Sequence, residues 1–245
     1  MGLFTPAWKG DNYNRAMAYT QKCTDQKRLF QIAREAPNPY VRAAAAERLT
    51  DPEYLFAVAL DSRGGEAAET AADRLEDPAL LLQLAATTQK EERGKKALER
   101  ITDPELLFQA ARTAGLSAIR ASAASRIERQ DQLSEIARKD SNAEVRLRAV
   151  KLLTDQDSLA GIAQSDQSVM VRREALSRIR DASVRLELGG KDPDEGIRLE
   201  AAAERGDQKT LEEFALKSRN PEVRRKAAEH LEDQHILETV ARGDK

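Results

Sequence analysis

The sequence predicts an all-α fold, a right-handed α-solenoid of eight short two-helix repeats. The first observation is a register: eight of nine positions spaced 26 residues apart, from Asp25 to Asp233, are Asp, and Arg129 is the exception. An uninterrupted period of this length is typical of stacked helical repeats. The second is composition, because 40% hydrophobic but only 4% aromatic residues suit Ala- and Leu-rich helical stacks. The third is that the sequence lacks the close Leu-x-Leu alternation of a strand, which excludes leucine-rich repeats.

The register divides the chain into three parts. We expect residues 1–24 to form an N-terminal cap and half repeat, residues 25–232 to form eight repeats, and residues 233–245 to form a C-terminal half repeat. Eight of the ten aromatic residues lie within the first 56 positions. We interpret them as a cap, because the end of a solenoid must cover its apolar face. An aromatic docking site is the alternative.

The first helix of each repeat is predicted to begin after the recurrent Asp, whose carboxylate accepts hydrogen bonds from the amides of the first turn. Pro follows the Asp in three repeats, at the position where a missing N–H costs nothing. Apolar residues lie four, seven and eight positions after the Asp, on one helical face. The first of these columns holds Leu29, Leu55, Leu81, Leu107, Leu133, Leu159, Leu211 and Leu237.

The second helix is predicted to open with Val or Ile followed by Arg, after a polar stretch with breakers such as Asn38-Pro39. Three residues after the Arg position, every repeat carries Ala. A position held to Ala indicates that two backbones approach closely, so this column is the predicted seam between neighbouring helices. Its members are Ala45, Ala71, Ala97, Ala123, Ala149, Ala175, Ala201 and Ala227.

The two short helices, the recurrent Asp and the Val-Arg-x-x-Ala signature resemble the HEAT family of helical repeats, in a short form, over residues 25–232. The resemblance implies a ladder in which a recurrent Arg meets an Asp between successive units. The Asp partners would be either the capping column or the residues before the second helix, such as Asp140, Asp166 and Asp192. The ladder should be interrupted where Ala68 and Gly94 replace the Arg. The ladder arginines would be Arg42, Arg120, Arg146, Arg172, Arg198 and Arg224.

Two further departures from the register carry expectations. Arg129 replaces a capping Asp, so the first turn of its helix needs a compensating carboxylate, for which Glu128 is the candidate. Arg185 and Gly189 replace Leu and Ala in the seventh repeat, which we expect to be the softest joint of the array. Small rotations would let Val184, Leu186 and Leu188 restore its burial.

A second basic column lies three residues before the capping positions. We interpret it as a set of i,i+3 ion pairs with the following Asp residues, which add little stability each. The alternative is a stripe that binds phosphate or an acidic peptide. The column holds Arg48, Arg74, Arg100, Arg126 and Arg178.

The residues that carry chemistry do not form a catalytic or metal-binding pattern. The single cysteine, Cys23, excludes a thiolate cluster, and His230 and His235 lack a third ligand. No phosphate loop or catalytic triad can be placed. We therefore expect no enzymatic activity, no catalytic residue, no metal and no cofactor. The net charge of −2 argues against nucleic acid, the lack of a long apolar run argues against a membrane, and a cytoplasmic location is expected.

The expected function is that of a non-enzymatic scaffold, which binds a peptide or protein on the face lined by the second helices. In three successive repeats, Leu147, Met170 and Leu199 are predicted to form an apolar stripe on that face. An apolar stripe with a charged rim suits a peptide-binding groove. The alternative is that these residues turn into the seam. A nucleic-acid-binding HEAT-like protein and a HEAT-like lyase or chaperone for a small molecule are the other functions considered. The rim residues are Arg148, Arg173, Glu174 and Glu200.

Overall fold

The computed structural model describes residues 6–61 and 65–243. These residues form eighteen α-helices and one short 3₁₀ helix, and they contain no strand. The all-α prediction is therefore confirmed. None of the described helices is both long and apolar enough to cross a membrane. The chain forms two compact units, residues 1–127 and residues 128–245.

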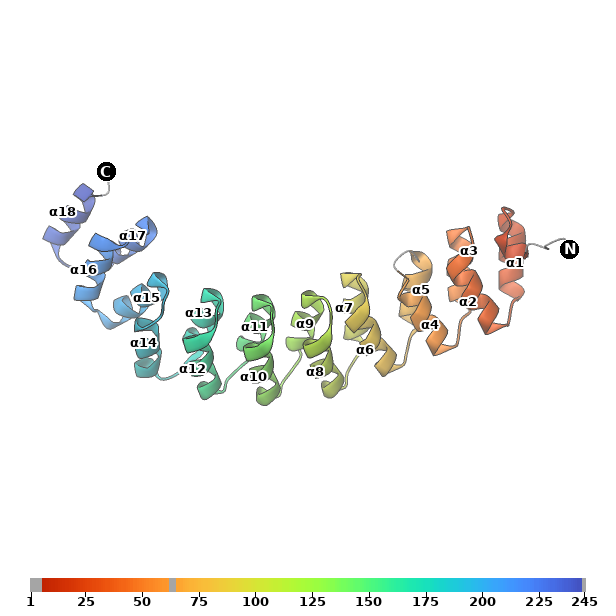
Figure 1. Ribbon diagram of the computed structural model, residues 1–245, viewed down its shortest axis with the longest axis horizontal. Helices are drawn as coiled ribbons and strands as arrows, with labels where there is room; N and C mark the ends of the chain where they lie inside the picture. Colours follow the sequence, from red (N-terminus) through yellow and green to blue (C-terminus); the bar gives the residue numbers. More distant parts are fainter. Residues whose placement is uncertain (1–5, 62–64, 244–245) are drawn as a thin grey trace. The chain divides into compact units, whose positions relative to one another are not determined.

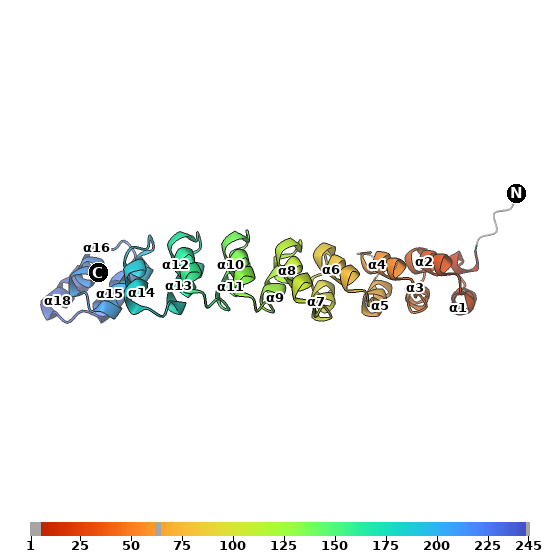
Figure 2. The ribbon, with the colours of Figure 1, turned by 90° about the horizontal axis from the view of Figure 1, so that it is seen from below.

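The first unit consists of η1 (Ala7–Lys9), α1 (Tyr13–Lys22), α2 (Gln26–Glu35), α3 (Pro39–Ala46), α4 (Pro52–Ala59), α5 (Glu66–Arg74), α6 (Pro78–Thr87), α7 (Glu91–Glu99), α8 (Pro104–Thr113) and α9 (Ser117–Ala124). Its helices alternate between two layers (Figures 1 and 2). One layer holds α2, α4, α6 and α8, and the other holds α1, α3, α5, α7 and α9. Neighbours within each layer are in contact, and each even-numbered helix packs against the helix that follows it.

The second unit consists of α10 (Gln130–Lys139), α11 (Ala143–Val150), α12 (Gln156–Ser165), α13 (Val169–Arg178), α14 (Ala182–Gly190), α15 (Glu195–Arg205), α16 (Gln208–Lys217), α17 (Pro221–Glu229) and α18 (Gln234–Gly243). From α10 to α16, each even-numbered helix packs against its successor. Helices α10, α12 and α14 are in contact in turn, and α11 contacts α13. Along the chain from α2 to α18, every even-numbered helix starts 26 residues after the previous one, as the register predicts.

The recurrent Asp caps the even-numbered helices. Its carboxylate accepts hydrogen bonds from backbone amides two or three residues later, which satisfies donors that the helix itself leaves unpaired. In α10, Arg129 stands in this position and donates from Nη2 to Asp131 Oδ2 at 2.6 Å. The compensating carboxylate is therefore Asp131, in the first turn, and not Glu128. The capping residues are Asp25, Asp51, Asp77, Asp103, Asp155, Asp181, Asp207 and Asp233.

The two predicted core columns are buried. The Leu column lies in the core from Leu29 to Leu159 and again at Leu211. Every member of the Ala column is buried, from Ala45 to Ala227, with at most 6% exposure, at Ala201. These columns hold each pair of helices together, because burial of apolar side chains is the main driving force available to short helices.

Helix α14 is the exception to this packing. Its single buried residue is Gly189, and a Cβ at that position would lie 3.1 Å from the Cβ of Ala201 in α15. Val184 remains 39% exposed, so it does not restore the missing burial. Arg185 instead donates to the carbonyl of Ile179 at 3.1 Å and pairs with Glu204. Helix α14 is thus held more by polar contacts and by close backbone approach than by a core column.

Arg93 lies next to one of the two positions of the first unit that lack a ladder arginine. It is 3% exposed and donates to Glu69 and to the carbonyl of Ala59, both at 2.7 Å. It therefore connects α7 to the preceding repeat, and it does not bind the carbonyl six residues earlier as the ladder arginines do. At Gly94 itself, a Cβ would lie 2.8 Å from Ile119 Cδ1, so a larger residue would push the end of that side chain aside.

Long-range clamps tie successive repeats together through the backbone. The second basic column donates to carbonyls 25 to 28 residues earlier, at the end of the preceding second helix, and not to the following Asp side chains as expected. A recurrent Gln makes a contact with the repeat that follows it in the chain. Its side-chain oxygen accepts from the amide 24 residues later, at 2.6 to 3.1 Å. The glutamines are Gln26, Gln130, Gln156 and Gln208.

Overpacking should distinguish the Ala seam from the outer surface. Ala149 and Ala175 are fully buried, so Ala149→Leu or Ala175→Leu should lower the free energy of unfolding by about 1–3 kcal/mol. The matched change Ser177→Leu, at an exposed position of α13, should change it by less than about 0.5 kcal/mol. Urea unfolding followed by circular dichroism measures both. Equal losses at the two kinds of site would contradict the seam.

Candidate functional site

The structure separates the three members of the predicted apolar stripe. Leu147 in α11 is 8% exposed and Leu199 in α15 is 3% exposed, whereas Met170 at the start of α13 is 66% exposed. The outward orientation expected for Leu147 and Leu199 is wrong, and Met170 alone projects into solvent. The physical reason is that a second helix packs against its own first helix and against neighbouring second helices. Its buried arc is therefore wider than one amphipathic stripe.

The charged rim residues have separate roles. Arg148 pairs with Glu144 of its own helix at 3.2 Å, and Glu174 is half-buried on α13. Arg173 crosses from α13 to α15, where its guanidinium lies 3.2 Å from Glu200 and 3.7 Å from Asp194. The structure thus joins two of the four predicted rim residues, Arg173 and Glu200, in one ion-pair network.

Gly196 lies directly beneath the Arg173 network. A Cβ at Gly196 would lie 3.0 Å from Asp194 Oδ1 and 3.2 Å from the Arg173 guanidinium. A larger residue here would therefore shift the ends of these two side chains slightly, and glycine leaves them room against the first turn of α15.

A cleft of about 480 Å³ opens beside this network, on the face formed by α13, α15 and α17. Its apolar lining includes Leu199, Ala203 and Val223, and both Leu199 and Val223 belong to the buried core cluster of this part of the unit. Its charged lining has four carboxylates, Asp194, Glu195, Glu200 and Glu222, against the two cations Arg173 and Lys226. The cleft is therefore a mostly polar depression with a net negative lining and a few apolar side chains among it.

The ladder arginines form a second polar feature, between the helix layers. Each donates from Nη1 to the backbone carbonyl six residues earlier, at 2.6 to 3.0 Å, which satisfies the end of its own first helix. In the second unit, two of them also bind a carboxylate of the next repeat. Arg146 donates to both oxygens of Asp166 at 2.7 and 2.8 Å, and Arg172 donates to both oxygens of Asp192 at 2.8 Å.

These contacts decide between the two partners that the sequence left open. The ladder carboxylates are the residues before the second helix, and the capping column takes no part in these pairs. Each carboxylate also accepts from the backbone amide two residues later, as Asp192 does from Asp194 at 2.7 Å. One side chain thus closes a turn and neutralises an arginine of the preceding repeat.

The Arg172–Asp192 pair is nearly inaccessible to solvent, with 6% and 1% of the two side chains exposed. Burial by itself raises the pKa of Asp192. The hydrogen bonds from Arg172 and from the Asp194 amide outweigh that effect, so the pKa of Asp192 lies below its usual value. The hydrogen bond with Asp192 likewise raises the pKa of Arg172. Both groups are charged at neutral pH.

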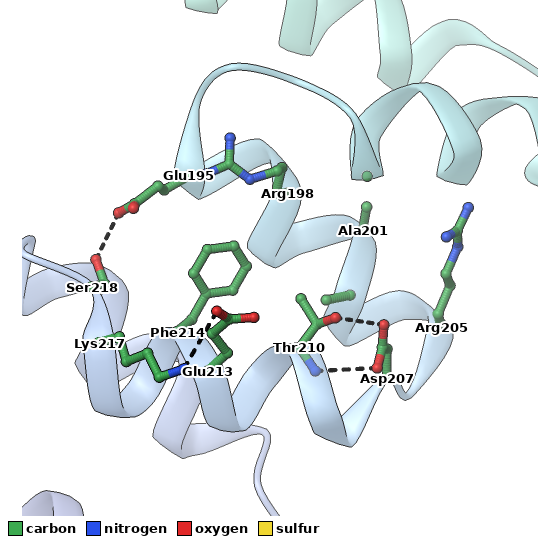
Figure 3. A pocket seen from close by; sticks show the side chains of 12 residues that line it. Glu195, Arg198, Ala201, Arg205, Asp207, Thr210, Glu213, Phe214, Lys217 and Ser218 are labelled. Atoms are coloured by element: carbon green, nitrogen blue, oxygen red, sulfur yellow. Dashed lines mark hydrogen bonds and ion pairs between the residues drawn. The ribbon is translucent and has the colours of Figure 1, made fainter.

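The next rung of the ladder opens onto a pocket of about 370 Å³ between α15 and α16 (Figure 3). Arg198 donates to the carbonyl of Asp192 at 2.6 Å, and its guanidinium lies 5.6 Å from the centre of the Phe214 ring. Ser218 stands where the two preceding rungs have Asp, and its hydroxyl donates to Glu195 at 2.6 Å. Sequence reasoning missed this pocket, although the replacement of Asp by Ser218 in the 26-residue register could have found it.

The described residues contain no group of three or more His, Cys, Asp or Glu side chains arranged to hold a metal ion. The polar groups of both depressions are instead ion pairs and open hydrogen-bonding groups, which suit binding. Comparison of the sequence with models of known protein families and with curated proteins gives no match.

Because the Arg172–Asp192 pair is buried, removing one of its partners should lower the free energy of unfolding by more than removing a partner of an exposed pair. Asp192→Ala leaves Arg172 buried without a counter-charge and should lower the free energy of unfolding at pH 7 by about 3–5 kcal/mol. Glu200→Ala removes the exposed partner of Arg173 and should cost no more than about 1 kcal/mol. Urea unfolding measures both, and a cost of the Asp192 change as small as that of the Glu200 change would contradict a buried pair.

The pH dependence has a definite sign. The folded-state pKa of Asp192 is depressed, so the carboxylate contributes its stability above the unfolded pKa of about 3.9 and loses it as the pH falls through the folded value. The difference in stability between the parent chain and Asp192→Ala should therefore be constant near neutrality and should narrow below about pH 4. A difference that widens on acidification would contradict this assignment.

Proposed function

We propose that the chain is a non-enzymatic protein-interaction scaffold, a right-handed solenoid of eight short HEAT-like repeats that binds a polypeptide on the face lined by its second helices. The resemblance of its signature residues to HEAT repeats and the constant spacing of its first helices support this architecture. The observation that supports the binding face best is the cleft formed by α13, α15 and α17, whose net negative lining includes the apolar residues Leu199, Ala203 and Val223.

The charge of the cleft indicates what kind of segment it binds. Four carboxylates face two cations, and Arg173 is already paired with two of those carboxylates, Asp194 and Glu200. A segment with Lys or Arg residues complements this rim, because rim charges select partners and steer their approach. An apolar side chain of the same segment fits against Leu199 and Val223. The partner is thus a basic, partly apolar stretch of another polypeptide.

Nucleic acid is the weaker candidate on the same evidence. A nucleic-acid site needs unpaired cations that neutralise phosphates, whereas this rim carries an excess of carboxylate. Met170, which projects from the start of α13, adds an adaptable apolar contact of the kind used by protein-binding surfaces. The cleft therefore suits a polypeptide.

The experiment selects random peptides of one length against the purified chain and measures their affinity for matched variants by fluorescence anisotropy. Selected peptides should be enriched in Lys or Arg. The double variant Glu200→Lys, Glu222→Lys should lower their affinity on the order of 10-fold, because two attractive charges become repulsive ones. The control Glu187→Lys with Glu238→Lys makes the same change in net charge on exposed positions of α14 and α18. It should leave the affinity within about twofold.

Two results would count against the proposal. One is an equal loss of affinity in both double variants, which would indicate attraction by net charge alone. The other is a selection that yields only acidic peptides while the parent chain binds a short oligonucleotide and the Glu200→Lys, Glu222→Lys variant binds that oligonucleotide more tightly.

A further inference from the structure

We propose that Arg198, in the pocket between α15 and α16, is a binding site for a carboxylate group supplied from outside the chain. The site lies between helix layers and opens away from the second-helix cleft, with which it shares the lining residue Glu195. Its ligand is a monocarboxylate group, either an Asp or Glu side chain of a bound polypeptide or a free carboxylic acid.

The first argument is the comparison of successive rungs within this unit. Arg146, Arg172 and Arg198 occupy the same register position, and all three donate Nη1 to the carbonyl six residues earlier. In the first two, Nε and Nη2 form a fork that holds both oxygens of a carboxylate at 2.7 to 2.8 Å. The backbone contact thus presents an arginine whose remaining donors fit a planar carboxylate.

The second argument is what Ser218 does in place of Asp. Its Oγ accepts from the Asn220 amide at 3.1 Å, which is the turn contact that Asp192 makes with Asp194. It donates to Glu195 and makes no contact with Arg198. Ser218 therefore preserves the turn but supplies no counter-charge. Among the described residues, Nε and Nη2 of Arg198 have no hydrogen-bond partner.

The third argument is that the carboxylates near Arg198 are committed elsewhere (Figure 3). Glu195 accepts from Ser218 at 2.6 Å, and Glu213 pairs with Lys217 at 3.6 Å. Asp207 caps α16 by accepting from the amide of Thr210 at 3.2 Å and from its hydroxyl at 2.7 Å. The pocket therefore has room of about 370 Å³ next to a cation that its own acids leave unneutralised.

The surroundings favour a monocarboxylate over phosphate. The Phe214 ring lies beneath the guanidinium and, with the Asp192 carbonyl, fixes its orientation, so little freedom is lost on binding. The lining holds three carboxylates, Glu195, Asp207 and Glu213, and three cations, Arg198, Arg205 and Lys217, so its charges balance. The preference for a carboxylate therefore comes from the fork that Arg146 and Arg172 use for the same group.

The test titrates the ¹⁵N-labelled chain and follows the Nε–H resonance of Arg198 by NMR. The probes are butyrate, the capped peptide acetyl-Gly-Gly-Glu-Gly-Gly-amide, and inorganic phosphate. Both carboxylate probes carry one negative charge and should shift this resonance with saturation, and phosphate should bind more weakly. Tighter binding of the peptide identifies a polypeptide side chain as the source, and tighter binding of butyrate identifies a free acid. Arg198→Lys keeps the charge but removes the fork and the Nε–H, so binding to this variant is followed through the backbone amide resonances of α15 and α16. Its affinity for the carboxylate probes should be roughly 10- to 100-fold lower.

A variant that leaves Arg198 intact separates binding from folding. Ser218→Asp combined with Glu195→Gln places a carboxylate of this chain at the rung and should abolish binding while raising the melting temperature. The matched control, Ser218→Asn with Glu195→Gln, has the same size without the charge and should still bind. The proposal is overturned if the Asp variant binds as well as the control, if phosphate binds more tightly than the carboxylates, or if no carboxylate shifts the resonance.

Discussion

The ends of short helices are the constraint on which this structure depends. A helix of eight to eleven residues leaves four amides and four carbonyls without partners inside the helix, so about a third to a half of its backbone groups are end groups. Short helices are also unstable alone in water. The chain meets both demands with side chains placed by the 26-residue register. Asp caps the amides of the first helices, and Asn caps three of the second helices, at Asn38, Asn142 and Asn220. The ladder arginines bind carbonyls of their own repeat. The second Arg column and the Gln column connect neighbouring repeats, so the backbone bonding that keeps a helix stable also fixes its neighbour.

The departures from the register follow the same rule. Where Arg129 replaces a capping Asp, Asp131 provides the negative charge within the first turn of the helix, and the hydrogen bond from Arg129 lowers the pKa of Asp131. Where Gly94 replaces a ladder Arg, the neighbouring Arg93 satisfies the carbonyl of Ala59 and pairs with Glu69. In each case a nearby residue restores the hydrogen bond or the charge, because an unsatisfied buried group costs more than an exposed one. Arg198 differs from these cases, since Ser218 replaces its counter-charge and no described residue restores it.

Features set by spacing within one helix could be predicted from the sequence. Contacts between side chains of different repeats could not. Asp caps, the Leu column and the Ala column follow from spacing within one helix, and the structure places them as expected. Leu147 and Leu199 were assigned to the surface because a single-sided helix was assumed, whereas a helix within a stack is covered on several sides. The partners of Arg146 and Arg178 lie 20 and 25 residues away. A register shows that two columns recur together, but the length and direction of the side chains decide which atoms meet.

The position of the Arg198 rung gives the proposed carboxylate a mechanical consequence. Helix α14 buries only Gly189, so the buried apolar residues of the repeat that contains Arg198 come from α15, and α14 itself relies largely on polar contacts. In the two preceding rungs, a carboxylate of this chain joins successive repeats permanently. At Arg198 the same bond would form only while an external carboxylate is bound, and its stabilising effect would grow with ligand concentration according to RT ln(1 + [L]/Kd). The repeat formed by α14 and α15 is therefore the one whose stability an external ligand would set. Binding at the pocket would then order the contact of α15 with α16, on which Leu199 and the floor of the second-helix cleft also depend.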